Sequence, residues 1–428
     1  MKVLLINKYF YIKGGSETYF FGLKQMLEEH NHTVIEFSMK DERNEDSSYE
    51  GYFVSHIDYE QNGSLLAKMK NGLKLIHSKE AFSKLCRLIE DTRPDVAHVN
   101  LIYHQLTPSV LLALKKYGIP VVLTSHDYKL ICPNYKLFNN DQICTKCIGG
   151  KYYNCFLGKC HKDSRSYSLL LTMEAYFHKF RKTYQIADVI ICPSDFMYNM
   201  LLESGFSKSK LTHIPNFVAQ DFTSHDINLC AEGKGDYFLY YGRLSKEKGL
   251  DLLLDSMKLL KDGNRLIIVG TGPEEGHLQE RVRDERIANV RFTGFKSGEE
   301  LNRLIREAKA TIIPSVWHEV FGLTIVESYQ LGTPVIGSRV GGISELIEDQ
   351  KSGYLFNGGD AGELAQAMQE LNRLNSEAYR LIRGHCLSKA QEYGAQAYYQ
   401  AIIVIYERLQ LINQNRTAGV GPEILSGS

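Results

Sequence analysis

The segment from Glu319 to Glu327 carries the sharpest chemical signal in the sequence, because two carboxylates flank a glycine at an expected helix start. The apolar run before it predicts a strand, and the pattern after Gly322 predicts a helix. Free N–H groups at a helix start bind phosphate or sugar hydroxyls, and glycine lets a ligand approach closely. If the residues between them are helical, the two carboxylates lie ~12 Å apart. The two catalytic carboxylates of a glycosidase lie closer, at roughly 5–9.5 Å. The spacing suits an elongated ligand held at two points, and two ordinary surface glutamates that flank a buried helix are the equal alternative.

Basic residues follow another expected strand, in the loop Gly242-Arg243-Leu244-Ser245-Lys246-Glu247-Lys248-Gly249. Arg243 can place two hydrogen bonds on phosphate oxygens, and Lys248 adds a compact positive charge. A solvated turn is the alternative interpretation of this loop. The turn Gly270-Thr271-Gly272 lacks the third glycine of the dinucleotide-binding fingerprint.

Three weaker signals also lie in segments that follow expected strands. The pair Gly14-Gly15 follows the first strand, and His126 stands in Ser125-His126-Asp127 at the end of another. A histidine in a cleft can bind a hydroxyl, although a lone histidine more often has a structural role. Phe295 ends the segment RFTGF, whose backbone groups can face a nucleobase.

The elements that must position these residues alternate between strand and helix throughout the chain. We expect strands at 2–7, 32–37, 94–99, 120–124, 189–192 and 211–215, and again at 237–241, 265–269, 290–292, 310–314 and 334–337. Apolar strands that alternate with helices predict parallel sheets covered on both faces. Since 428 residues exceed the roughly 250–300 of a single core, we predict an α/β protein with two doubly wound domains. Ligands in such sheets bind at the carboxyl ends of the strands, in a cleft.

Charge and hydropathy exclude several classes. The 50 basic and 50 acidic residues balance, so the chain has no overall basic field for nucleic acid. No run approaches the roughly 18 apolar residues of a membrane span, and the first residues lack a signal peptide's long apolar region. We therefore expect a cytoplasmic protein. Residues 1–220 carry 27 basic and 22 acidic residues, so this half is the one expected to face an anionic partner.

Five of the nine cysteines fall within residues 128–163, an insertion that interrupts the alternating pattern. Cys144 and Cys147 have the spacing of half a zinc knuckle, and cysteines in a cytoplasmic protein are metal ligands or thiols before they are disulfides. We predict a structural zinc site, with reduced thiols that pack the insertion as the alternative. The expected ligands are Cys132, Cys144, Cys147 and Cys160, and Cys155 competes for a place among them.

In chain order, these signals resemble the retaining, nucleotide-sugar-dependent glycosyltransferases of family GT4, which have the GT-B fold. Ile214-Pro215-Asn216, Thr333-Pro334-Val335 and Gly341-Gly342-Ile343-Ser344-Glu345 also match the family pattern. The resemblance extends over nearly the whole chain, to about residue 411, and is strongest over 237–358. A Cys-rich insertion after the His-Asp pair occurs in a subset of these transferases, of the bacterial polysaccharide-biosynthesis type.

The resemblance implies four domain segments. Residues 1–216 would form the acceptor-side domain, and 217–395 would bind the nucleotide sugar after a linker at 219–236. Residues 396–412 would form a helix that crosses back to the first domain, and 413–428 a flexible tail.

It also implies a role for each site residue. Arg243 and Lys248 should neutralise the donor diphosphate, Glu319 should hold the donor sugar, and Glu327 should bind the ribose. His126 should touch the sugar near its reacting face. The predicted catalytic residues are thus His126, Arg243, Lys248 and Glu319, and the predicted donor-binding residues are Gly15, Gly270, Gly272, Phe295, Phe321, Gly322, Leu323 and Glu327.

The expected reaction uses a UDP- or GDP-sugar and no catalytic metal, because the chain contains no D-x-D triplet and fixed cations with a helix start can stabilise the leaving diphosphate. The expected acceptor is a saccharide, lipid-linked as for many relatives. The basic, aromatic segments 65–93 and 165–184 favour peripheral contact with the inner face of the plasma membrane, and packing against the sheet is their alternative. The rival enzymes are an NAD-dependent oxidoreductase and a phosphorylase or hydrolase of nucleotide sugars. A zinc module that recognises nucleic acid is disfavoured by the zero net charge.

Overall fold

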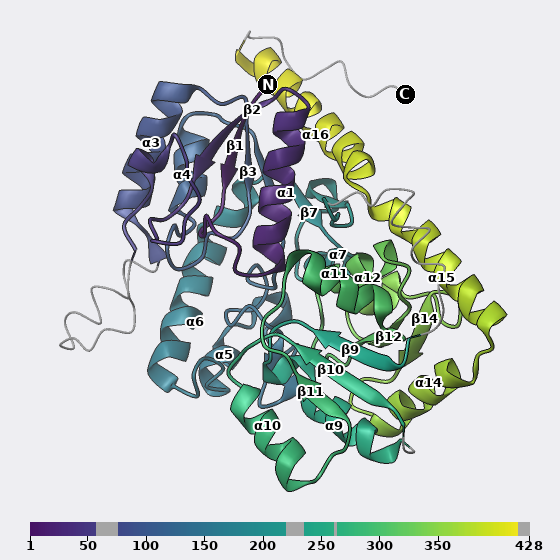
Figure 1. Cartoon of the computed structure of the whole chain (residues 1–428). Helices are drawn as coiled ribbons and strands as arrows, with labels where there is room; N and C mark the ends of the chain where they lie inside the picture. The colour runs from purple at the N-terminus through teal and green to yellow at the C-terminus, as the bar shows by residue number, and fades with distance from the viewer. Residues whose placement is uncertain (57–75, 220–234, 261–262, 418–428) are drawn as a thin grey trace.

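The computed structural model of the chain describes residues 1–56, 76–219, 235–260 and 263–417. Two six-stranded sheets dominate it, one in each half of the chain. Every strand pair within them is parallel. The two sheets and their helices lie side by side, with the first half of the chain at the upper left in Figure 1. The predicted fold class, two doubly wound parallel-sheet units, is therefore confirmed.

The first sheet has the strand order β2-β1-β3-β4-β7-β8. Alternate side chains of β1 enter two different cores, as a strand with two covered faces requires. Leu4 and Ile6 pack with α3 and α4, whereas Val3 and Leu5 pack with α1 and α16. The strands are β1 (Lys2–Ile6), β2 (Thr33–Phe37), β3 (Val96–Val99), β4 (Val121–Thr124), β7 (Val189–Cys192) and β8 (Leu211–His213).

The second sheet has the strand order β11-β10-β9-β12-β13-β14. Helices α9, α10 and α14 cover one face, and α11, α12, α13 and α15 cover the other. The strands are β9 (Tyr237–Tyr241), β10 (Arg265–Val269), β11 (Val290–Phe292), β12 (Ala310–Ile313), β13 (Val335–Ser338) and β14 (Gly353–Phe356).

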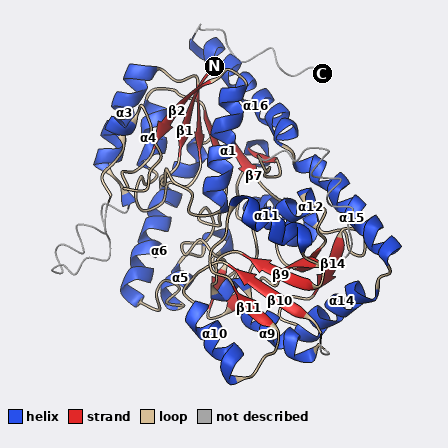
Figure 2. Ribbon diagram, in the orientation of Figure 1, coloured by secondary structure: helices blue, strands red, loops and turns tan. Residues whose placement is uncertain are grey.

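Helices surround both sheets (Figure 2). In the first half they are α1 (Gly15–Glu29), α3 (Lys79–Thr92), α4 (Ser109–Lys116), α5 (Tyr153–Leu157), α6 (Arg165–Phe180) and α7 (Asp195–Glu203). In the second half they are α9 (Leu250–Leu259), α10 (Glu275–Asp284), α11 (Gly298–Glu307), α12 (Leu323–Gln330), α13 (Ile343–Leu346), α14 (Ala361–Arg373), α15 (Ser376–Ala390) and α16 (Ala395–Thr417). The insertion adds α5 and the two-stranded hairpin of β5 (Phe138–Asn139) and β6 (Gln142–Ile143).

Helix α16 leaves the second half of the chain and packs on the first sheet, as the yellow ribbon in Figure 1 shows. The Tyr406 hydroxyl forms a hydrogen bond with the His98 ring on β3, and the Tyr398 hydroxyl forms one with the Tyr19 hydroxyl on α1. All four side chains are buried. The chain crosses between the halves twice, at 216–218 and at 393–394, and the Val218 N–H donates to the Tyr393 carbonyl at 3.2 Å. The two crossings therefore lie against each other.

The structure differs from the sequence prediction in several elements. Strand β14 and helices α7 and α14 were not predicted. Helix α16 continues to Thr417, so the start of the predicted tail is helical. The rest of that tail, most of the predicted linker at 219–236 and residues 65–75 of the basic segment lie outside the described residues.

Among the described helices, none is both long and apolar enough to span a lipid bilayer.

Replacing Tyr406 by alanine tests how strongly α16 is anchored. Tyr406 is fully buried and bonds to His98, so we expect the variant to lose about 3–5 kcal/mol of unfolding free energy, measured by urea denaturation. Val404 on the same helix is 62% exposed, and Val404→Ala should change that free energy by less than about 0.5 kcal/mol. Equal effects of the two substitutions would contradict this packing.

Candidate active site

The carboxyl ends of the two sheets contact each other directly. A Cβ atom added to Gly15, at the start of α1, would lie 3.1 Å from Leu323 Cδ1, at the start of α12. The centroid of the Phe196 ring, at the start of α7, lies 4.4 Å from the centroid of the His318 ring. The residues after β1 and β7 thus contact the residues after β12. Each predicted donor-binding residue lies in a loop at the carboxyl end of a strand, or on α1 or α12.

Glu319 and Lys248 form an ion pair at the centre of this region. Lys248 Nζ lies 2.6 Å from Glu319 Oε1, and the Ser315 hydroxyl donates to the same oxygen at 2.7 Å. Glu319 is 9% exposed. Burial raises the pKa of its carboxyl, but the Lys248 ammonium and the hydrogen bonds outweigh burial and hold the pKa below its ordinary value. Glu319 is therefore a charged, fixed acceptor group.

Helix α12 begins directly after this pair. Gly322 precedes it with φ +114°, a conformation that favours glycine, and no side chain caps the helix. The Tyr241 hydroxyl of β9 donates to the Thr324 carbonyl at 2.7 Å, which fixes the first turn. An uncapped helix start can bind a phosphate or a sugar hydroxyl. Because Glu319 precedes the helix, the ~12 Å helical spacing expected between it and Glu327 does not apply.

Glu327 lies on α12 and is partly buried. Burial raises the pKa of its carboxyl, and the neighbouring Tyr241 hydroxyl opposes that rise. Arg243 is exposed, while its carbonyl accepts a hydrogen bond from Tyr240 at 2.8 Å. Phe295 is 72% exposed. Both exposed side chains are accessible to a ligand at the strand ends.

The two glycines after β10 have an evident packing role. A Cβ atom on Gly270 would lie 1.9 Å from the Gly242 carbonyl oxygen, and one on Gly272 would lie 2.2 Å from that of Leu244. The Leu244 N–H donates to Thr271 at 3.0 Å. These glycines let the loop after β10 pack against the loop that carries Arg243 and Lys248.

His126 follows β4 in the first sheet. Its Nε2 lies 2.8 Å from Asn100 Oδ1, and the Asn100 amide donates to the Ile6 carbonyl at 3.4 Å. This amide orientation makes Asn100 Oδ1 an acceptor and assigns the imidazole proton to Nε2, so Nδ1 carries the lone pair. Burial lowers the pKa of His126 to about 3. The ring is therefore neutral at physiological pH.

Several contacts between the halves of the chain were not predicted. The Glu345 carboxylate accepts the first N–H groups of α7, from Asp195 and Phe196, at 2.8 and 2.7 Å. Lys136 of the insertion lies 3.3 Å from Glu247 of the Arg243–Lys248 loop. Glu345 belongs to the sequence motif at 341–345, but a local pattern cannot predict its contact with a residue about 150 positions away. The insertion thus contacts the loop expected to hold the donor diphosphate.

The predicted zinc site at Cys132, Cys144, Cys147 and Cys160 stays a prediction. Within the described ranges, which include the whole insertion, no group of three or more His, Cys, Asp or Glu side chains is arranged to hold a metal ion. Cys147 and Cys155 instead pack with Tyr152 and Leu171, and burial raises the pKa of the Cys132 thiol to about 11. None of the eight described cysteines forms a disulfide bond. Cys144 and Cys160 are partly exposed.

Comparison with known proteins identifies the family. A model described as Glycosyltransferase Family 4 matches residues 13–222, and one described as Glycosyl transferases group 1 matches residues 223–384. An uncharacterized glycosyltransferase of Methanocaldococcus jannaschii is 24% identical over 90% of this chain and 91% of its own length. The O-antigen chain mannosyltransferase C of Escherichia coli is 31% identical over 38% of this chain and 45% of its own length.

A solved structure supports the same fold. HepE of Anabaena, in complex with UDP-glucose, superposes with a TM-score of 0.64 at 17% identity and covers 95% of this chain and all of that one. The two family models together span residues 13–384. The chain therefore belongs to the family 4 type of glycosyltransferases and has the GT-B fold. This assignment displaces the oxidoreductase alternative.

The neutral state of His126 predicts a pH effect on stability. In the unfolded chain histidine titrates near pH 6.5, whereas in the native protein the pKa of His126 is about 3. Between these values the unfolded chain binds a proton that the native protein does not, so stability falls as the pH falls. His126→Asn should remove up to about 1.4 kcal/mol per pH unit of that slope.

Urea unfolding at several pH values between 7 and 4 measures this slope. The matched control is His277→Asn, because the His277 side chain is 55% exposed and should leave the slope nearly unchanged. A slope that is the same in wild type and His126→Asn would show that His126 is accessible to protons in the native protein.

Proposed function

We propose that this glycosyltransferase moves a sugar from a nucleoside diphosphate sugar to a saccharide hydroxyl with retention of the anomeric configuration. The carrying observation is the Lys248–Glu319 pair, held 2.6 Å apart beside the uncapped start of α12. A cation, a buried carboxylate and free N–H groups are the set that a sugar diphosphate needs. Relatives named as glycosyltransferases and a neighbour in complex with UDP-glucose support this donor class.

Each predicted site residue has a role in this proposal. Arg243 and Lys248 neutralise the diphosphate, and the N–H groups of Phe321, Gly322 and Leu323 bind beside it. Glu319 accepts hydrogen bonds from the sugar hydroxyls. Glu327 binds the ribose, Phe295 packs on the base, and Gly15 lets the loop before α1 approach the diphosphate. Gly270 and Gly272 keep the Arg243 loop in place through the backbone contacts described above.

In the proposed chemical step, the bond from the sugar C1 to the β-phosphate oxygen breaks as the acceptor oxygen attacks C1 from the same face. The acceptor proton passes to the departing phosphate oxygen. Negative charge develops on that phosphate, and fixed cations with a helix start stabilise it without reorganisation. Neutral His126 contributes its Nδ1 lone pair as an acceptor for a donor-sugar hydroxyl. We propose that the reaction needs no catalytic metal, because Arg243, Lys248 and the start of α12 already supply positive charge.

We propose that residues 1–216 form the acceptor domain and 217–395 the donor domain, with 396–412 anchoring the second to the first. The contact of Val218 with Tyr393 supports this division, because both chain crossings lie at the same place. The proposed acceptor is a lipid-linked saccharide at the inner face of the plasma membrane. The name of the O-antigen mannosyltransferase supports a role in surface polysaccharide synthesis.

Thermal unfolding with UDP, GDP, ADP and NAD tests the donor class. A ligand at 100 times its dissociation constant adds about 2.7 kcal/mol of stability, so we expect UDP or GDP to raise the melting temperature by several degrees and NAD to leave it unchanged. Arg243→Ala should lose this shift because it removes a diphosphate ligand. Arg283→Ala is the control, since Arg283 in the same domain is 71% exposed. A shift with NAD alone would overturn the proposal.

A further inference from the structure

A large hollow lies at the amino ends of strands in the first sheet, whereas the candidate active site lies at the carboxyl ends. It has a volume of about 670 Å³ and is bounded by the loops that enter β4, β7 and β8 and by the end of α16. His126 and Asp195 follow β4 and β7 at their other ends. Because successive parallel strands share one orientation, the hollow and the donor site lie at opposite edges of the sheet.

Positive charge dominates the lining of this hollow. Lys115, Arg181, Lys182 and Lys210 line it, and Asp188 is its single carboxylate. The Asp188 carboxylate already accepts the Val121 N–H at 2.9 Å. Lys210 Nζ donates only to main-chain carbonyls, those of Gln185 and Ala187, at 2.5 and 2.8 Å. The lining therefore has a net charge of +3 by this count of four cations and one anion.

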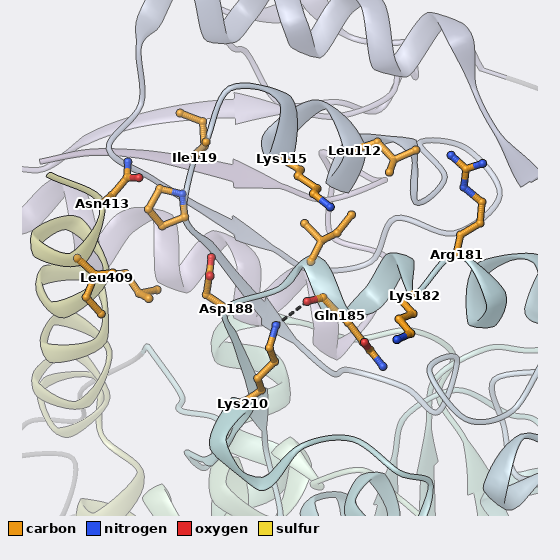
Figure 3. Close-up of a pocket in the computed structure, with 14 residues that line it drawn as sticks. Leu112, Lys115, Ile119, Arg181, Lys182, Gln185, Asp188, Lys210, Leu409 and Asn413 are labelled. Atoms are coloured by element: carbon orange, nitrogen blue, oxygen red, sulfur yellow. Dashed lines mark hydrogen bonds between the residues drawn. The ribbon is translucent and has the colours of Figure 1, made fainter. Parts of the chain in front are cut away.

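The lining of the hollow also includes apolar side chains. Leu409 of α16 lies at the end opposite to Arg181 and Lys182, beside the polar side chains of Asn413 and Asp188 (Figure 3). Ile119, Pro120 and Ile412 add further apolar surface. A site that combines several cations with apolar side chains fits an amphiphilic anion better than a free ion.

An exposed apolar stripe on α6 leads to the cationic end. Leu169, Met173, Phe177 and Phe180 follow at intervals of four, four and three residues, the spacing of one helix face. They are 44%, 54%, 40% and 80% exposed. The next two residues are Arg181 and Lys182, and no acidic residue occurs between Glu174 and Asp188. Large apolar side chains beside cations are typical of a helix that lies on an anionic bilayer.

We propose that the hollow binds the phosphate headgroup of an anionic phospholipid while the α6 stripe enters the bilayer surface beside it. The lysines and Arg181 neutralise the phosphate, and the apolar wall contacts the glycerol and acyl ends of the lipid. This inference deepens the membrane contact of the proposed function by assigning the lipid and its residues. It does not require the transfer reaction, because its site lies at the other edge of the sheet.

Flotation of the full-length protein with vesicles tests the proposal. The vesicles are phosphatidylcholine alone and phosphatidylcholine mixed with phosphatidylglycerol. We expect binding to the mixed vesicles only, and Lys115→Ala/Lys182→Ala should weaken it by about tenfold or more, since each basic residue near an anionic surface adds to the affinity. Phe180→Ser should also weaken it. The matched control, Arg283→Ala/Lys351→Ala, removes the same charge from exposed sites of the other domain and should bind like wild type.

Three outcomes would overturn the proposal: no binding of wild type to the mixed vesicles, equal losses in the two double variants, or an unaffected Phe180→Ser variant. Thermal stabilisation by inorganic phosphate without vesicle binding would assign the hollow to a free phosphate and overturn the lipid assignment. The melting temperature and its shift with UDP or GDP report folding and donor binding in each variant. If UDP and GDP leave the melting temperature unchanged while vesicle binding is intact, the proposed function is contradicted and the lipid proposal is not.

Discussion

The contact between the Lys248 ammonium and the buried Glu319 carboxylate is the interaction on which the site depends. A buried carboxylate is costly unless it is paired and hydrogen-bonded, and here Lys248 and Ser315 both reach the same oxygen. The pair fixes the loop between β12 and α12. Main-chain contacts reinforce it, since the Val316 N–H donates to Glu247 at 3.0 Å and the Gly342 N–H donates to Glu319 at 2.8 Å. A fixed loop in turn fixes where α12 starts and where its N–H groups lie.

The same loop joins the two halves of the molecule. Val320 belongs to the apolar core of the first sheet, and the Tyr128 hydroxyl, two residues after His126, reaches the Glu319 carbonyl at 3.5 Å. Glu345 places a carboxylate on the first N–H groups of α7, where the helix dipole favours negative charge. Tyr128 of the insertion therefore contacts the loop between β12 and α12, and Lys136 contacts Glu247 in the neighbouring Arg243–Lys248 loop. These contacts, together with α16, join the two halves of the chain.

Much of the fold was predictable, because short apolar runs mark the strands and glycine turns follow several of them, such as β9 and β10. The predicted bounds of β7, β9, β10 and β11 agree with the structure. Helix α14 was missed although its signal was present, since Asp360 caps it by accepting the Glu363 N–H at 3.0 Å. The family and its fold were correctly predicted, but the site residues remain predictions. The contacts of Lys136 and Glu345 join residues over 100 positions apart, so no local pattern could predict them. The spacing of the cysteines did not reveal that burial raises the pKa of the Cys132 thiol.

The central claim is that a preorganised clamp of Arg243, Lys248 and the start of α12 carries out retaining transfer without a metal. The most direct test is proton NMR of the product formed from an α-linked nucleotide sugar in the presence of excess EDTA. The account predicts an α-linked product at an undiminished rate, because attack by the acceptor on the face from which the diphosphate departs retains the configuration. A β-linked product, or a reaction that stops with EDTA and resumes with added metal, would contradict it.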